Sequence, residues 1–175
     1  MKTRLTLLTC LIVGICLIWA IPACADVVSD WNAIAAQTAI PARPGPSAVL
    51  DLAMVHAAMH DAIQAYQGRF ESYSGSIPNA SGSPIAAAAR AAHDVLAARF
   101  PSQSGTLDTL LNDYLTGLGL QGDAGLLTGQ QAAANILNLR AGDGSFPSNP
   151  EIFIGGTAPG EWRPTPPAFA PMATP

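Results

Sequence analysis

Five segments of this chain repeat apolar residues at a spacing of three or four, and this pattern constrains the fold more than any other feature. Such spacing lines up apolar side chains along one face of an α-helix. No stretch alternates apolar and polar residues convincingly at a period of two, as a half-buried strand would. Alanine is abundant and aromatic residues are few, which favours closely packed helices over a β-sandwich. The sequence predicts an all-α fold, a helical bundle of about five helices over segments 27–39, 47–67, 84–100, 104–118 and 123–141.

The residues that flank these segments carry signals for helix starts and stops. Asp26, Ser29 and Asp30 are candidate N-caps of the first helix. Ser83 is a candidate N-cap of the third, with a proline at the favoured first helical position. The stretch IPARPGPS at 40–47 is expected to break the chain between the first two helices, because it holds three prolines and a glycine.

Each segment has an expected core face when residues are placed 100° apart. Asp61 points nearly opposite the apolar stripe of its segment and is therefore expected to face away from the core. The expected core positions are, segment by segment, Val28, Trp31, Ile34 or Ala35 and Thr38; Leu52, Val55, Met59, Ile63 and Tyr66; Ile85, Ala88, Ala89, Ala92 and Leu96; Leu107, Leu110, Leu111, Tyr114 and Leu115; and Leu126, Gln130, Ala133 and Leu137.

Residues 1–25 have the pattern of a secretory signal peptide. Lys2 and Arg4 precede an apolar run over 5–21, and Ala-Cys-Ala at 23–25 forms an A-x-A-type cleavage site. We therefore expect a secreted or periplasmic protein with no membrane segment after cleavage. Two alternatives remain open: the run stays as an N-terminal anchor, or Cys24 is lipidated within a poor lipobox that contains a proline.

Removal of the signal peptide changes the chemistry that the chain can offer. All three cysteines and the only lysine leave with it, so no disulfide and no thiolate ligand remains. Six arginines then face twelve acidic residues, a formal charge of −6 with neutral histidines. This balance argues against nucleic acid as a partner, because phosphate backbones require clustered basic residues.

The remaining residues divide into a helical domain at 26–144 and a tail at 145–175. Eight prolines fall within the last thirty residues, and no helical stripe is present there. Proline removes backbone donors, so this tail is expected to run extended over another surface. Its apolar contact candidates are Trp162, Phe153, Ile154 and Phe169. A chain that stops inside such a run is interpreted as truncated.

Two histidines four residues apart, His56 and His60, are the candidate metal ligands. A helix places both imidazoles on one face. A metal would need a third ligand, for which His93 or Asp94 is a candidate. The glutamate of a His-Glu-x-x-His motif is missing, because position 57 is alanine. The favoured interpretation is that both histidines lie at the edge of the core and hydrogen-bond to neighbouring helices, so no catalytic, cofactor or metal site is assigned.

Other residue patterns are interpreted as structural. Asp51 and Asp61 are ten positions apart, roughly 15 Å along a helix axis, and are expected to cap or to bind arginines of other helices. His93 and Asp94 are adjacent, and side chains at i and i+1 are not expected to face each other. The chain has no G-x-S-x-G elbow and no Walker loop. RAGDGS at 140–145 follows a helix and is interpreted as a C-cap loop.

Five stretches together resemble the N-terminal helical region of bacterial vanadium-dependent haloperoxidases, members of the type-2 phosphatidic acid phosphatase superfamily. The resemblance extends in order over nearly all of 27–175, and GEWRPTPP is its most distinctive piece. The stretches are VVSDWNAIAAQTA, PGPSAVLDLAMVHAAMHDAIQAYQGRFESY, AAAARAAHDVLAARFPSQ, GQQAAANILNLRAGDG and PGEWRPTPPAFAPMATP.

The resemblance implies an all-helical protein whose relatives hold vanadate, or transiently phosphate, as peroxidases or phosphatases. In that family the oxyanion cage comes from three motifs: a Lys followed six residues later by Arg-Pro, a Pro-Ser-Gly-His, and a Ser-Arg with a His six residues on. This chain has none of them. Arg43-Pro44 and Arg163-Pro164 are present, but no lysine precedes either at the required distance.

No catalytic residue of the family is therefore transferred to this chain, and the three histidines are not its nucleophile or vanadate ligand. The prediction is an exported N-terminal helical part that is inactive alone, whose partner is the missing C-terminal helical half. Vanadate or phosphate is implied only for full-length relatives. The alternatives are a free-standing exported binding module that holds a metal through His56 and His60, and a decayed or wrongly terminated gene.

Overall fold

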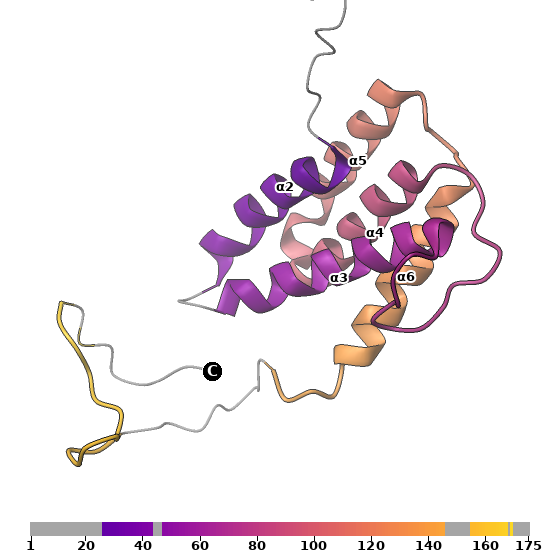
Figure 1. Ribbon diagram of the computed structural model, residues 1–175. Coiled ribbons are helices and arrows are strands. Elements are labelled where there is room, and N and C mark those ends of the chain that lie inside the picture. Colours follow the sequence, from indigo (N-terminus) through magenta and orange to yellow (C-terminus); the bar gives the residue numbers. More distant parts are fainter. Residues whose placement is uncertain (1–25, 44–46, 146–154, 168, 170–175) are drawn as a thin grey trace, which may run out of the picture.

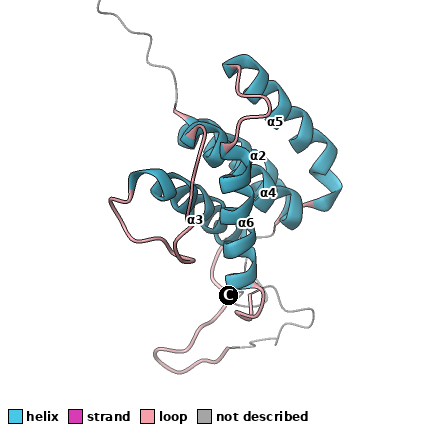
Figure 2. Ribbon diagram, turned by 90° about the vertical axis from the view of Figure 1, so that its right-hand side faces the viewer, coloured by secondary structure: helices cyan, strands magenta, loops and turns pink. Residues whose placement is uncertain are grey.

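The computed structural model describes residues 26–43, 47–145, 155–167 and 169, and it confirms the all-α class. These residues contain five α-helices and no strand (Figures 1 and 2). The signal peptide predicted at 1–25 lies outside the described residues. The elements are α2 (Val27–Ala42), α3 (Ser47–Gln67), α4 (Pro84–Arg99), the 3₁₀ turn η1 (Pro101–Gln103), α5 (Ser104–Leu118) and α6 (Gly125–Arg140).

Local signals place most helix starts where the sequence predicts them. The Asp26 carboxylate accepts a hydrogen bond from the Ser29 N–H at 2.8 Å and caps α2. The Ser83 hydroxyl oxygen accepts from two backbone N–H groups at the start of α4. The predicted break at 40–47 comes too early, because α2 continues through Pro41 to Ala42. Pro41 cannot donate to the carbonyl four residues earlier and its ring crowds that carbonyl, so the disturbance falls in the last turn of α2, one residue before the helix ends.

Helix α4 is the centre of the bundle and packs against α2, α3, α5 and α6. Its buried residues lie on most sides of the helix rather than on one stripe, as a helix surrounded by others requires. The prediction for Ile85 is wrong, since this side chain is exposed at the helix start. The fully buried neighbours at that end are Ala86, Ala87, Ala88 and Ala89.

The face of α6 that meets α4 is built from small residues. A Cβ atom at Gly129 would clash with the carbonyl oxygen of Ala87 and lie 2.8 Å from Cβ of Arg90. This close approach explains why the predicted stripe of α6 is displaced: Gln130 is exposed, and Leu126 and Leu137 are only partly buried. The buried residues are Gly125, Thr128, Gly129, Ala132, Ala133 and Ile136.

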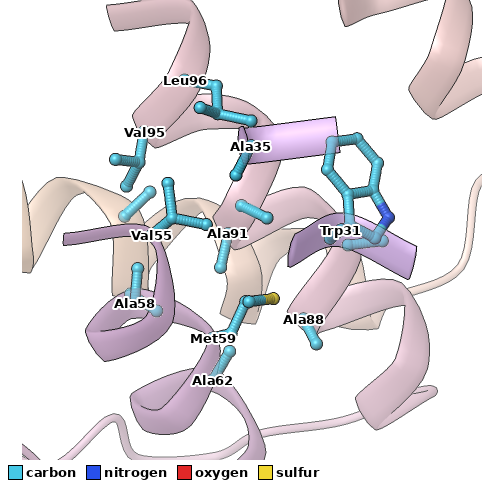
Figure 3. Packing of buried hydrophobic residues seen from close by; sticks show 14 of the residues in the cluster. Trp31, Ala35, Val55, Ala58, Met59, Ala62, Ala88, Ala91, Val95 and Leu96 are labelled. Atoms are coloured by element: carbon cyan, nitrogen blue, oxygen red, sulfur yellow. The ribbon is translucent and has the colours of Figure 1, made fainter. Parts of the chain in front are cut away.

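The remaining core faces follow the predicted stripes only in part, since Val28 of α2 and Tyr114 of α5 are partly buried. In α2 the buried choice is Ala35 rather than Ile34, and in α5 Leu110 is exposed while its other leucines at helical spacing are buried. In α3 only Val55 and Met59 of the predicted stripe are buried, whereas Leu52, Ile63 and Tyr66 are partly buried. Asp61 is buried, against prediction, since the loop at 71–76 covers it. The cluster joins α2, α3 and α4 through residues such as Trp31, Val55 and Leu96 (Figure 3).

The described part of the proline-rich region contains no helix. The Gly156 N–H donates to the Trp162 carbonyl oxygen at 3.0 Å, so the backbone turns back on itself over this stretch. The predicted contacts of Phe153 and Ile154 fall outside the described residues. Within the part of the chain that the structure describes, no helix is both long enough and apolar enough to cross a membrane.

Candidate functional site

A half-open groove of about 590 Å³ lies between α3 and α6 and is the candidate site. Its wall is mostly apolar, with four polar side chains from α3, α6 and the loop after α3. The apolar residues are Leu50, Ala53, Met54, Ala57, Ile136 and Leu139, and the polar residues are His56, His60, Tyr73 and Arg140.

His56 enters the groove from the edge of α3 and is positioned by α2. Its Nε2 lies 2.9 Å from the Asn32 amide oxygen. This contact confirms the prediction that the imidazole hydrogen-bonds to a neighbouring helix. A hydrogen bond at one ring nitrogen fixes the ring orientation and leaves Nδ1 as the remaining nitrogen.

His60 lies one turn further along the same groove but is held differently. Its Nδ1 is 3.2 Å from a carboxylate oxygen of Asp61, the next residue of its own helix. Its ring meets the Tyr73 ring edge-on, with centroids 5.3 Å apart. The predicted partner of His60 was a neighbouring helix, whereas the structure uses the same helix and the following loop.

The structure separates His93 and Asp94 from the histidine pair. His93 lies at the contact of α4 with α5, where its Nε2 is 2.9 Å from Asp108. Asp94 binds Arg90 at 2.7 Å. Among the described residues no group of three His, Cys, Asp or Glu side chains is close enough to share a metal ion.

The expectation that His93 and Asp94 do not interact is wrong. The His93 Nδ1 lies 2.7 Å from an Asp94 carboxylate oxygen, although the residues are adjacent on one helix. The carboxylate reaches the ring because Arg90, one turn earlier, binds the same group and draws it to that side. Burial acts to raise the pKa of Asp94, but hydrogen bonds from His93 and Arg90 outweigh it and hold this pKa below its ordinary value.

The two carboxylates of α3 are structural, as predicted. Asp51 accepts from Arg43 Nε at 2.8 Å and from Arg99 Nε at 2.6 Å, which confirms the expected arginine contacts. Asp61 instead binds the loop after α3: its carboxylate accepts hydrogen bonds from the Tyr73 N–H at 2.7 Å and the Ser74 N–H at 2.9 Å. Neither carboxylate is placed for acid–base chemistry.

Four arginines of the bundle are likewise bound to aspartates. Arg43 and Arg99 share Asp51, Arg90 binds Asp94, and Arg140 pairs with Asp143 at 2.5 Å just beyond the end of α6. These four cations therefore neutralise carboxylates at helix contacts and ends. They bind three different aspartates, whereas a cage for a tetrahedral oxyanion requires cations that converge on one point.

Sequence reasoning missed the groove itself. Tyr73 and Arg140 belong to segments far apart in the chain, and their meeting depends on how α6 packs against α3. One local signal was present: Ala53, His56, Ala57 and His60 recur at helical spacing, and small residues beside two imidazoles on one face leave that face hollow.

Comparisons with models of protein families, with curated proteins and with solved structures find no match. The resemblance to haloperoxidases therefore stays a prediction from the sequence.

Proposed function

We propose that this chain is the exported N-terminal helical part of a protein similar to vanadium-dependent haloperoxidases, and that it acts as a scaffold for a catalytic helical half. The family part of the proposal rests on the five stretches that resemble this family in order over 27–175, and the pairing of the bundle's arginines with aspartates supports the scaffold role. Arg43 and Arg99 bind Asp51, and Arg90 binds Asp94, so their charge stabilises helix contacts. In this proposal vanadate or phosphate belongs to the complete protein and not to this bundle.

The first test is catalytic. The purified chain is mixed with orthovanadate, hydrogen peroxide and bromide, and bromination of a phenolic dye is followed. The expected rate equals that of a buffer control, and p-nitrophenyl phosphate is expected to remain unhydrolysed. The ⁵¹V NMR signal of vanadate should keep its free line width. Dye bromination or a broadened vanadium signal, abolished by Arg43→Gln or Arg90→Gln, would contradict the proposal.

The second test concerns the catalytic half. The nucleotides after codon 175 are read and, if the frame can be restored, the longer product is expressed. We expect that product to carry the Lys-x6-Arg-Pro and Ser-Gly-His motifs and to brominate the dye with vanadate. A following sequence that encodes neither motif in any frame would reject the resemblance and favour a free-standing module.

A second candidate function, metal binding through His56 and His60, is favoured by one specific observation. Each imidazole already has an oxygen acceptor at one nitrogen, Asn32 for His56 and Asp61 for His60. Metal-ligating histidines commonly have such a partner at the second ring nitrogen. His56 Nδ1 and His60 Nε2 would be the ligand atoms.

The test for this candidate is a thermal melt with and without Zn²⁺. Metal binding predicts a rise in Tm that grows with zinc concentration and is lost in the variant His56→Gln/His60→Gln. Gln67→Ala, at the exposed end of the same helix, serves as the control and should keep the rise. An unchanged Tm in the parent chain would exclude the metal site.

A further inference from the structure

We propose that the groove between α3 and α6 binds a small molecule with an apolar body and a single anionic head group. The apolar side chains of the groove would pack against the apolar body of the ligand. Leu50, Met54 and Ile136 line the groove together with exposed Leu139, and the alanines Ala53 and Ala57 leave the space between them. A volume of about 590 Å³ falls within the range of small-molecule sites, roughly 300–1,000 Å³.

The charge of the lining selects the head group. Arg140 is a cation and the Tyr73 hydroxyl can donate a hydrogen bond, so these two side chains are the anion-binding groups of the lining. The second ring nitrogens of His56 and His60 donate to an anion only when the imidazole is protonated. No carboxylate is among the described lining residues. The sequence as a whole has twelve acidic residues against eight basic ones, so its net charge is negative and disfavours anions. The groove lining has a cation and no acidic residue among the described residues, so an anion is favoured there.

The two carboxylates nearest to these polar groups are already occupied. Asp61, which contacts His60, is buried and accepts from the Tyr73 N–H and from the Ser74 N–H and hydroxyl. Asp143, which pairs with Arg140, also accepts from Ser145. Arg140 has five N–H donors and can hold a second anion beside Asp143.

The test uses the purified chain and the fluorescent probe 8-anilinonaphthalene-1-sulfonate, an aromatic body with one sulfonate. We expect saturable binding with one site per chain. Ala53→Trp fills the groove and should weaken binding at least about tenfold, whereas Ala98→Trp, a matched change at an exposed alanine of α4, should leave it unchanged. Circular dichroism must show that both variants keep the parent helix content.

A pair of competitors separates the head group from the body. Decanoate and 1-decanol have the same apolar chain and differ in charge. Decanoate should displace the probe at a concentration about threefold lower than decanol, a ratio expected for one partly exposed ion pair. Arg140→Gln should bring this ratio to about one, and Arg69→Gln, outside the groove, should not.

Three outcomes would overturn the proposal. Equal probe binding by Ala53→Trp and Ala98→Trp would place the probe elsewhere. Equal displacement by decanoate and decanol in the parent chain would remove the head-group site. A dimer in light scattering that Ala53→Trp breaks would assign the groove to a second copy of the chain. The catalytic tests of the scaffold role do not depend on any of these results.

Discussion

Helix α3 buries two carboxylates ten residues apart, and the molecule compensates them in opposite ways. Asp51 is fully buried and is bound by the guanidinium groups of Arg43 and Arg99. Asp61 is 1% exposed and is bound by the backbone N–H groups of Tyr73 and Ser74 and by the Ser74 hydroxyl. One carboxylate is matched by formal charges and the other by neutral donors.

The difference decides what each carboxylate holds together. Arg43 follows α2 directly and Arg99 is the last residue of α4, so Asp51 joins three helices at one end of the bundle. Asp61 binds only the loop after α3, and that loop presents Tyr73 to the groove. Asp61 also contacts Nδ1 of His60 and so orients the imidazole ring. Loss of Asp51 should therefore affect the whole fold, and loss of Asp61 mainly the groove side.

The largest expected effect is that of Asp51→Ala, a loss of about 3 kcal/mol in the free energy of unfolding. The substitution removes the buried carboxylate that accepts from two guanidinium groups, each about a quarter exposed. Urea unfolding measures the loss as a lower midpoint with an unchanged slope. Asp113→Ala, at an exposed aspartate of α5, should change the free energy by less than about 0.5 kcal/mol. Equal midpoints for the two variants would show that Asp51 does not tie the helices.

Asp61→Ala should cost about 2 kcal/mol, because the partly buried donors from Tyr73 and Ser74 lose their acceptor. The loss should be local. Hydrogen exchange of the Tyr73 and Ser74 amides should become fast. Exchange of the α4 amides should accelerate only by the factor that corresponds to the loss in the global free energy of unfolding. Uniformly faster exchange, with no excess at the loop, would erase the distinction between the two carboxylates.

Ser74→Ala removes one of the donors to Asp61 and should cost about 1 kcal/mol. The backbone N–H of residue 74 does not depend on the side chain, so the loop should keep most of its protection. The matched variant is Ser72→Ala in the same loop, because the loop donors to Asp61 in the described part of the chain are Tyr73 and Ser74 and not Ser72. Urea midpoints compare the two. A larger loss for Ser72→Ala would contradict the assignment.

The pH dependence of stability should be the smallest effect. Burial acts to raise the pKa of the Asp61 carboxyl, but the Ser74 hydroxyl and the Tyr73 and Ser74 N–H groups outweigh it and hold this pKa below its ordinary value. A depressed pKa in the folded state gives stability that is present above the unfolded pKa of about 3.9 and is lost as pH falls.

The measurement for this prediction is urea unfolding at several pH values from about 6 to about 3. The parent chain should lose stability as pH falls, and Asp61→Asn should lose less, because it no longer takes up that proton. Asp113→Asn, at an exposed position, should follow the parent curve. A slope that is the same for all three proteins would show that Asp61 does not contribute to the acid sensitivity.

The helices could be predicted closely, because their signals are local. The predicted segments 47–67 and 104–118 match the bounds of α3 and α5, and Asp26 and Ser83 cap where their positions indicated. A cap is one hydrogen bond between residues two or three apart, so a short stretch of sequence contains both partners.

The candidate site could be predicted only in part. His56 and His60 were placed correctly on the edge of one helix, and the hydrogen bond of His56 to α2 was expected. Tyr73 and Arg140 were missed, since nothing in either segment indicates the other. The contact of His93 with Asp94 was excluded on spacing alone, and Arg90 and Asp108 make it favourable.

The sequence by itself determined the helical class, the number of helices and most of their ends, because hydrogen bonds within a helix join residues a few positions apart. Only the tertiary structure decided which faces are covered. Asp61 is buried although it lies off the apolar stripe, and Ile85 is exposed although it lies on one. Burial depends on which distant segment packs over a residue, and here close contact at Gly129 sets where α6 lies and with it the groove.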